Sequence, residues 1–383
     1  MDTKVKNKQK INLSDILTAF TFIIILGVLF IGNLIYTPPE ISLTERRTLA
    51  KRPDLTFKTI ENKKFMTGFE DYALDSFIGR DIFRNIKAFT LFNVFLQTDN
   101  NGLYHINGNI AKTEKLNITS VDLAGKYIEK LINDLKKNHQ NLKFYYSVIP
   151  DKGYYLLQKT DYRSIDYEKI EQLLSAQINS ARYIDIKNSL NADDYYKTDI
   201  HWDQSQLFEL VDTLKNEMNF SNISSENFNS NILTGFKGTF LNQIALPLKS
   251  ENLTYLTSSY TDNAIVHIQN GMTAEMELKK MYDPEAFDGV DPYDIFLSGP
   301  QTIITIENPL AQTERELYIF RDSFGSSLAP ILTSAYKRIV LIDLRYIPNT
   351  FLEQFIDFKD DSDVLFLYSM QILNNPSVLQ IAS

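Results

Sequence analysis

Residues 317–325 read Leu-Tyr-Ile-Phe-Arg-Asp-Ser-Phe-Gly, and residues 326–332 continue with Ser-Ser-Leu-Ala-Pro-Ile-Leu. The apolar run Leu317–Phe320 predicts a buried strand, and residues 326–332 predict the first turns of a helix. Ser323 therefore lies in the tight turn between them, with its hydroxyl at the carboxyl end of the strand. There its own N–H and the first free N–H groups of the helix can face a developing oxyanion. The pattern indicates a nucleophilic serine.

A serine hydroxyl is a weak nucleophile, so this interpretation requires a base and a group that orients the base. The segment Asp199-Ile200-His201-Trp202 offers both, because His201 alone among four histidines has a carboxylate two positions away beside the single tryptophan. In a catalytic triad, Ser323 would attack, His201 would take its proton, and Asp199 would hold the imidazole in one tautomer. Asp and Ser are also ordinary helix N-caps. The two motifs together favour a site over a cap.

Asp-x-His-Trp followed about 120 residues later by Asp-Ser-Phe resembles the DHHW-type proteins and the alginate O-acetyltransferase branch of the SGNH-hydrolase-like superfamily. The resemblance extends from about Ser42 to the C-terminus. It implies a flavodoxin-like, three-layer α/β/α core with the Asp–His pair upstream of the serine. It also implies that Ser323, His201 and Asp199 are the catalytic residues.

Short apolar strands alternate with helix-like stretches through much of the chain. The predicted strands include Lys143–Ile149, Leu317–Phe320, Ile339–Asp343 and Val364–Tyr368, and the predicted helices include Val121–Lys137, Gln204–Met218 and Ser326–Tyr336. Nearly continuous apolar strands are typical of a parallel sheet covered on both faces. We expect an α/β fold that is interrupted at about residues 221–312 by a mostly β insertion.

Three further residues are candidates for substrate contact: Arg321, Trp202 and Lys152. Ligands of parallel sheets bind beyond the carboxyl ends of the strands, and these residues lie at or near such ends. Arg321 suits an anionic substrate or an ion pair with Asp322, and the ion pair is favoured. Trp202 suits packing of its loop against the core better than contact with substrate. Lys152 matches a position of the resembled family that has no assigned role here.

The resemblance also indicates an oxyanion donor in the segment Ser298-Gly299-Pro300. Gly299 matches a family glycine whose backbone lies close to the oxyanion. Many relatives continue with Asn, whereas Pro300 has neither an N–H nor a polar side chain. The side-chain donor of those relatives is therefore missing from this sequence.

The N-terminal residues predict a membrane anchor. Lysines at positions 4, 6, 8 and 10 precede Ile16–Tyr36, a 21-residue stretch without charge that is long enough to span a bilayer as a helix. It shows no Ala-x-Ala cleavage pattern, so an uncleaved anchor is favoured over a secretory signal. The lysine-rich tail predicts a cytoplasmic N-terminus and an extracellular domain. The expected organisation is a tail (1–15), an anchor (16–37), a helical juxtamembrane region (38–110) and a catalytic domain (111–383).

Composition argues against several other kinds of function. The net charge is −9, so nucleic acid is not an expected partner. The absence of cysteine excludes disulfides and thiolate chemistry. The four histidines, at positions 105, 139, 201 and 267, lack the spacing of a zinc site, and we expect neither a metal nor a cofactor.

The leading functional prediction is a membrane-anchored extracytoplasmic O-acyltransferase, which acetylates a cell-surface polysaccharide through an acyl-Ser323 intermediate. The resemblance implies a partner that passes the acyl group across the membrane, a multi-spanning protein of the membrane-bound O-acyltransferase type. An esterase that uses the same triad with water as acceptor is an alternative. A non-catalytic scaffold or glycan-binding subunit of a polysaccharide assembly complex is another, and Pro300 supports it.

Overall fold

The computed structural model describes residues 12–157, 165–269, 271 and 275–381. The chain divides into two compact units, Met1–Thr90 and Leu91–Ser383. The four lysines of the predicted cytoplasmic tail lie outside the described residues.

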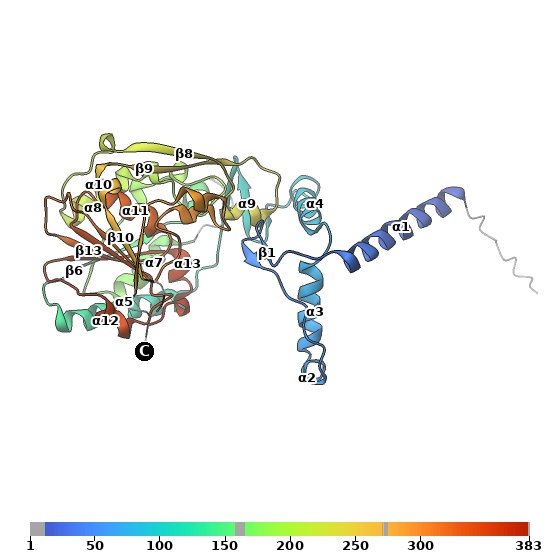
Figure 1. The fold of residues 1–383 in the computed structure, drawn as a ribbon, viewed down its shortest axis with the longest axis horizontal. Coiled ribbons are helices and arrows are strands. Elements are labelled where there is room, and N and C mark those ends of the chain that lie inside the picture. The colour runs from blue at the N-terminus through green and yellow to red at the C-terminus, as the bar shows by residue number, and fades with distance from the viewer. Residues whose placement is uncertain (1–11, 158–164, 270, 272–274, 382–383) are drawn as a thin grey trace, which may run out of the picture. The chain divides into compact units, whose positions relative to one another are not determined.

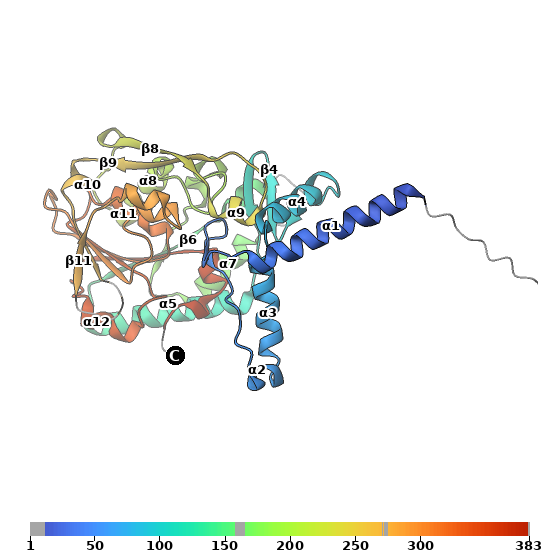
Figure 2. The ribbon, with the colours of Figure 1, turned by 45° about the vertical axis from the view of Figure 1, so that its right-hand side comes forward.

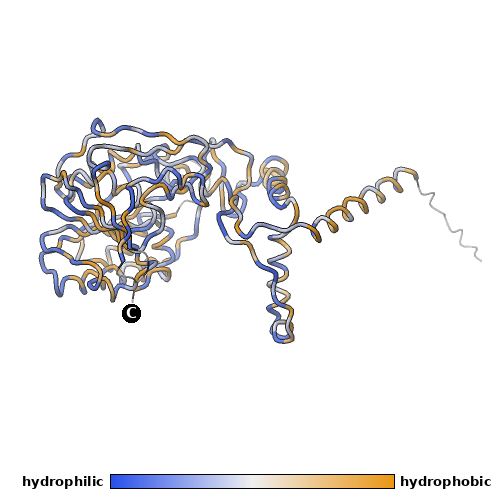
Figure 3. The backbone as a smooth tube through the Cα atoms, viewed as in Figure 1, coloured by the Kyte–Doolittle hydropathy of each residue, from blue (hydrophilic) through white to orange (hydrophobic). Residues whose placement is uncertain are grey.

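The first unit begins with α1 (Leu13–Ile35) and continues with three shorter helices, α2 (Phe57–Glu61), α3 (Lys64–Asp75) and α4 (Arg80–Asn93), the last of which crosses the unit boundary. Two short strands, β1 (Ile41–Ser42) and β2 (Arg47–Thr48), form an antiparallel pair. None of the residues of α1 is buried, and most of its residues are apolar, visible as the orange coil of Figure 3. The structure thus confirms a helix long and apolar enough to span a membrane.

An eight-stranded sheet forms the centre of the second unit (Figure 1). Five strands are parallel: β7 (Arg182–Tyr183), β6 (Lys143–Ile149), β15 (Asp363–Ser369), β13 (Glu316–Arg321) and β14 (Arg338–Ile342). Three more continue the sheet antiparallel beyond β14: β12 (Ile303–Glu307), β10 (Ile265–Gln269) and β11 (Met276–Lys279). The predicted α/β class with a largely parallel sheet is confirmed.

The last strand of the chain, β15, lies between β13 and β6. Counted in chain order, the five parallel strands are therefore arranged 2-1-5-3-4, whereas a flavodoxin-like sheet has the order 2-1-3-4-5. The predicted flavodoxin-like arrangement is not confirmed. The difference arises because β15 returns to the middle of the sheet instead of extending its edge.

Helices cover both faces of the sheet (Figure 2). The core on one face includes side chains of α5 (Ile118–Asn138) and α7 (Tyr167–Gln177), and the core on the other includes side chains of α8 (Phe208–Met218) and α11 (Phe324–Leu332). Along β13, Leu317 and Ile319 point into the second core, while Tyr318 and Phe320 point into the first. Each such buried apolar side chain stabilises the fold by roughly 1.5–3 kcal/mol, which explains why the strand is apolar at all four positions from Leu317 to Phe320.

Residues 221–312 and 99–112 contain strands that belong to several sheets. Within the first range only β8 (Asn229–Phe236) and β9 (Glu251–Thr257) form a separate two-stranded sheet, because β10, β11 and β12 pair with the central sheet. The second range forms β3 (Asp99–Asn100), β4 (Leu103–Ile106) and β5 (Asn109–Lys112), which belong to the second unit. Ile110 of β5 donates its N–H to Lys197 O at 2.8 Å. The two compact units divide between Thr90 and Leu91.

Short helices complete the second unit. They are α6 (Lys152–Leu157), α9 (Thr239–Ile244), α10 (Ser259–Asn263), α12 (Leu352–Phe355) and α13 (Met370–Leu373). Of these, α6 begins directly after β6, and α9 begins beside the loop that contains Asp199. Both helices contribute to the site described next.

Candidate active site

Ser323 occupies the turn between β13, which ends at Arg321, and α11, which begins at Phe324. Its residue is partly exposed, whereas Asp322 and Phe324 on either side are buried. Asp322 fixes the turn, because one carboxylate oxygen accepts the N–H of Phe324 at 3.1 Å and the other accepts the N–H of Ser369 at 2.8 Å. The serine hydroxyl is therefore presented at the carboxyl end of a central strand, as the sequence predicts.

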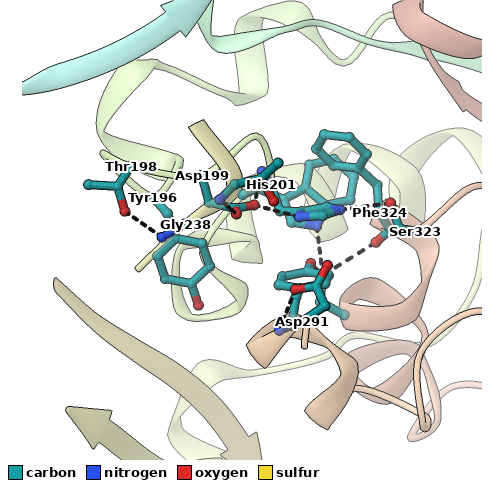
Figure 4. A network of polar contacts seen from close by, with 12 residues as sticks. Tyr196, Thr198, Asp199, His201, Gly238, Asp291, Ser323 and Phe324 are labelled. Carbon is teal, nitrogen blue, oxygen red and sulfur yellow. Dashed lines mark hydrogen bonds and ion pairs between the residues drawn. The ribbon is translucent and has the colours of Figure 1, made fainter. Parts of the chain in front are cut away.

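The three predicted triad residues meet in one hydrogen-bonded chain (Figure 4). Ser323 Oγ lies 2.7 Å from His201 Nε2, and His201 Nδ1 lies 2.6 Å from Asp199 Oδ1. A carboxylate only accepts hydrogen bonds, so Nδ1 carries the proton and donates it to Asp199. The lone pair of Nε2 then points at the hydroxyl of Ser323. This geometry suits removal of the serine proton by His201.

Asp199 is held in one orientation by hydrogen bonds to both of its oxygens. Its side chain is 0% exposed. Oδ1 also accepts the backbone N–H of His201 at 3.0 Å, and Oδ2 accepts the N–H of Thr239, the first residue of α9, at 2.6 Å. The neighbouring Gly238 comes so close that a Cβ there would lie 2.3 Å from the carbonyl group of Thr198. The backbone of residues 238–239 thus packs against the loop that contains Asp199 and helps to hold its carboxylate.

Aromatic side chains enclose the imidazole of His201. The ring of Tyr293 stacks on it with a centroid distance of 3.8 Å and an interplanar angle of 7°, and the ring of Phe324 lies 4.9 Å away. Tyr293 donates its hydroxyl to Ser327 Oγ at 2.7 Å, and Trp202 donates Nε1 to the same oxygen at 2.7 Å. These contacts fix the plane of the imidazole and exclude water from its face.

Lys152, at the start of α6, supports the same loop from within the protein. It is 2% exposed, and its ammonium group donates to the carbonyl oxygens of Tyr196 at 2.6 Å, Lys197 at 2.9 Å and Asp199 at 3.0 Å. Burial lowers the pKa of Lys152 to about 7, while the negative charges of Asp199 and Glu251 oppose that shift. All three donors of the ammonium group are used by the loop that carries Asp199.

Glu251, the first residue of β9, binds the N–H groups of the same loop. Its carboxylate accepts from Lys197 N at 2.8 Å and from Thr198 N at 2.7 Å, and it also accepts from the hydroxyl of Thr198. The peptide groups 196–197 and 197–198 therefore each have a carbonyl on Lys152 and an N–H on Glu251. We call these two side chains the Lys152–Glu251 clamp. It aligns two successive peptide dipoles between a cation and an anion.

The three candidates for substrate contact, Lys152, Trp202 and Arg321, are all buried. Lys152 has its donors on backbone carbonyls, and Trp202 is 0% exposed inside the core. Arg321 is 1% exposed and lies 3.8 Å from a carboxylate oxygen of Asp343, while its contact with Asp322 is to the carbonyl oxygen at 3.3 Å. Its favoured ion pair with Asp322 is therefore replaced by one with Asp343. None of the three side chains is exposed to a ligand in this conformation.

The predicted oxyanion donors are reduced to one. Gly299, with φ of 73°, donates its N–H to the carbonyl oxygen of Phe296 at 3.2 Å. The first N–H groups of α11, from Phe324 and Gly325, both donate to Asp322. The donor that remains from the predicted set is the N–H of Ser323 itself.

Sequence reasoning missed three contributors to the site: Glu251, Thr239 and Tyr293. Each acts through a contact that no local pattern signals, since Glu251 lies 54 residues from Lys197 and Thr239 lies 40 residues from Asp199. Tyr293 follows Pro292 in a single turn of 3-10 helix, which reads in the sequence as an ordinary loop.

Solved structures share this fold at low sequence identity. A DHHW family protein from Eubacterium siraeum is 18% identical, with a TM-score of 0.59, over 73% of this chain and 94% of its own. Bacillus cereus PatB1 is 19% identical, with a TM-score of 0.57, over 71% of this chain and 96% of its own. A second structure of PatB1 carries a sulfonyl adduct and has the same TM-score.

A weaker similarity, with a TM-score of 0.41 and 9% identity, covers 72% of this chain and 92% of the O-acetyltransferase domain of Pseudomonas putida AlgJ. The sequence matches no family model and no curated protein. The shared fold fits the branch of proteins that the Asp-x-His-Trp and Asp-Ser-Phe motifs resemble.

Proposed function

We propose that this protein is a membrane-anchored, extracytoplasmic O-acyltransferase that moves an acetyl group onto a hydroxyl of a cell-surface polysaccharide. The observation that supports it most is the continuous hydrogen-bonded chain from Asp199 through His201 to Ser323. A buried carboxylate, an oriented imidazole and a partly exposed hydroxyl are the parts that covalent acyl transfer requires.

In the first half-reaction, Ser323 Oγ attacks the carbonyl carbon of the acyl donor while His201 Nε2 takes the hydroxyl proton. The N–H of Ser323 donates to the oxyanion that forms. Collapse of this intermediate breaks the bond to the leaving group, which accepts the proton from His201. The acyl group is then an ester of Ser323, and Asp199 has stabilised the transient imidazolium.

The second half-reaction repeats these steps with a sugar hydroxyl in place of Ser323. His201 takes the proton of that hydroxyl, whose oxygen attacks the serine ester, and the serine oxygen leaves with the proton. The polysaccharide gains the ester, and the free enzyme is restored. With water as the acceptor, the same steps would make the protein an esterase.

In this proposal α1 spans the membrane, and its orientation determines on which side of the membrane the reaction takes place. With the lysine-rich tail in the cytoplasm, the second unit lies outside the cell, away from coenzyme-bound acyl donors. An acyl-carrying membrane protein of the membrane-bound O-acyltransferase type would then supply the acetyl group. The polysaccharide would approach Ser323 from the partly exposed side of the turn.

Intact-protein mass spectrometry of the full chain in detergent tests the nucleophile. After incubation with an activated acetyl ester, we expect one acetyl adduct on the wild type and on Ser326→Ala, and none on Ser323→Ala. Because PatB1 is known with a sulfonyl adduct, a sulfonyl fluoride is a second probe, which should label the peptide that contains Ser323. Equal labelling of the wild type and Ser323→Ala contradicts the assignment.

The acceptor is tested by adding oligosaccharides to the acetylated enzyme. We expect the rate of acetylated-sugar formation to exceed the rate of acetate release for at least one class of glycan. If acetate release is faster with every glycan, the acceptor is water and the protein is an esterase. If no acyl-enzyme forms at all, the non-catalytic alternative replaces both.

A further inference from the structure

Helix α4 has an apolar stripe on its exposed side. Ile82, Ile86 and Phe89 follow one another at helical spacing and are 63%, 55% and 54% exposed, whereas Ala88 is 0% exposed. Residues at i, i+4 and i+7 lie on one face of a helix. A row of apolar side chains that are this exposed is typical of a surface that meets a partner or a membrane.

Ion pairs in the first unit fix the rotation of α4 about its axis. Arg80 and Arg84 on its polar side both contact the carboxylate of Glu45, and Arg80 also lies 3.5 Å from Asp75. Arg47 binds Asp75 as well, and that hydrogen bond lowers the pKa of Asp75 to about 2. With its polar side held in this way, the apolar stripe is a fixed outward surface.

The position of the stripe relative to α1 indicates whether a protein or the membrane covers the stripe. Ile78, just before α4, donates its N–H to Asn33 Oδ1 at 2.8 Å, and its side chain lies 3.2 Å from where a Cβ of Gly32 would be. Gly32 and Asn33 belong to the last turn of α1. Ile82 is one helical turn beyond Ile78, so the stripe begins about 6 Å along α4 from that contact. If α1 spans the membrane, the start of α4 lies near the membrane surface.

The rest of the first unit shows the same pattern. Phe57 and Ile60 of α2 and Met66 and Leu74 of α3 are between 52% and 89% exposed. In Figures 1 and 2, one end of α3 lies near the end of α1, and the two helices run in different directions. An amphipathic helix that runs along the bilayer surface places its apolar side chains at the boundary with the acyl chains.

We propose that α4 lies in the interfacial layer of the leaflet from which α1 emerges, with Ile82, Ile86 and Phe89 inserted among the lipid acyl chains. This inference rests on the proposed anchoring by α1. An interfacial helix of this kind buries its apolar face about 5–10 Å into the boundary between headgroups and acyl chains. Lys87, exposed on another side of α4, would then face the headgroups or water.

The chain has no cysteine, so single-cysteine variants of the full protein can be labelled without background. We would label Ile86→Cys with an environment-sensitive fluorophore in vesicles of phosphatidylcholine and phosphatidylglycerol. Lys87→Cys is the matched control on the same helix, Phe89→Cys is a second stripe position, and Ile25→Cys reports on α1. Quenching by nitroxide-labelled acyl chains and by aqueous iodide is measured for each.

We expect the labels at Ile86 and Phe89 to be blue-shifted, quenched by the lipid nitroxide and protected from iodide, with the reverse at Lys87. If iodide quenches the labels at Ile86 and Phe89 while the lipid nitroxide quenches the label at Ile25, the inference about α4 is wrong and the anchoring by α1 still holds. Stripe positions protected from both quenchers would show a protein contact and also overturn it. An Ile25 label that lipid does not quench would refute the anchor itself, and the inference with it.

Discussion

Two segments meet at the site, and they are held in place in different ways. The serine turn, residues 321–324, lies between β13 and α11, and Asp322 within it binds Phe324 and Ser369. The base loop, residues 196–201, belongs to no regular helix or strand, and its polar groups are bound by side chains and backbone from elsewhere, including the Lys152–Glu251 clamp.

This difference shows which parts of the site are robust. The serine turn is fixed mainly by the strand and helix that it joins, so its position depends little on any one distant side chain. The base loop depends on charged groups that come from α6 and β9. We therefore expect changes far from the serine in sequence to disturb the base more than the nucleophile.

The largest expected effects come from removing the two reacting groups themselves. Ser323→Ala and His201→Ala should each lower acyl transfer from a chromogenic ester by roughly 10⁴–10⁶-fold, and the double variant should lose little more. The two segments then act as one unit in the reaction. Multiplicative losses in the double variant would mean that they act independently and would end the triad assignment.

Asp199→Asn is the next largest expected effect. An amide at this position favours the wrong tautomer of His201 and withdraws the charge that stabilises the imidazolium. The rate should fall by roughly 10³–10⁴-fold, about 4–5 kcal/mol of transition-state stabilisation. Circular dichroism melts should show the fold largely intact, and Asp193→Asn on the exposed side of a nearby turn is the control. A rate within about threefold of the wild type, far below triad-scale losses, would leave Asp199 as a loop residue only.

Lys152→Met and Glu251→Gln test the dependence of the base loop on its clamp. Each should lower the turnover rate by about 10- to 100-fold with less effect on substrate affinity, because small displacements of a catalytic group are amplified in the rate. In combination they should cost less than the product of the single effects, since both hold the same two peptide groups. If the effects of the two substitutions on the barrier add fully, Lys152 and Glu251 act independently and do not form one clamp.

The clamp also predicts a pH dependence. Asp199, Glu251 and Asp151 face Lys152, and burial lowers its pKa to about 7. Above that pH the neutral amine has two donors for three carbonyls, so activity should fall, and Glu251→Gln should move this fall to lower pH. Stability should change in the opposite direction. The unfolded chain, with an ordinary lysine pKa of 10.5, binds more protons than the folded one between pH 7 and 10.5, so this group adds stability as the pH rises.

Melting temperatures and rates of the wild type and Lys152→Met across pH 6–10 separate the two effects. The alkaline loss of rate that belongs to the clamp should be absent from the variant. If rate and stability rise and fall together in both proteins, Lys152 is a purely structural residue.

The smallest expected effect is in the serine turn. Asp322→Asn keeps one of the two acceptors that bind Phe324 and Ser369, so the free energy of unfolding should fall by about 1–2 kcal/mol. Turnover should drop by no more than about tenfold, equivalent to roughly 1.4 kcal/mol in the barrier. Chemical denaturation and ester kinetics measure both quantities. A larger loss of rate here than in Lys152→Met would reverse the comparison between the two segments.

These differences also explain what the sequence could predict. Strand, turn and helix are contiguous around Ser323, and Asp199 and His201 are two residues apart, so local pattern predicts that all three belong to one site. The clamp joins positions 44 to 54 residues apart, and the stacking of Tyr293 on His201 arises from the folded chain alone. Arg321 ends β13, and Asp343 directly follows β14. The sequence does not show that these two strands are neighbours in the sheet, so it could not predict the ion pair of Arg321 with Asp343.

The position of β15 in the sheet determines at what stage of synthesis and folding the site can form. The strand that leads to Ser323 and the strand that leads to Lys152 are joined in the sheet only through β15, which follows both of them in the chain. A chain that is still being synthesised or threaded across a membrane would have both halves of the sheet before it has the strand that connects them. The two halves must therefore wait for residues 363–369, and pairings over so long a separation form slowly. Removal of β15 would leave every proposed catalytic residue in the chain but would separate the strand before Ser323 from the strand before Lys152.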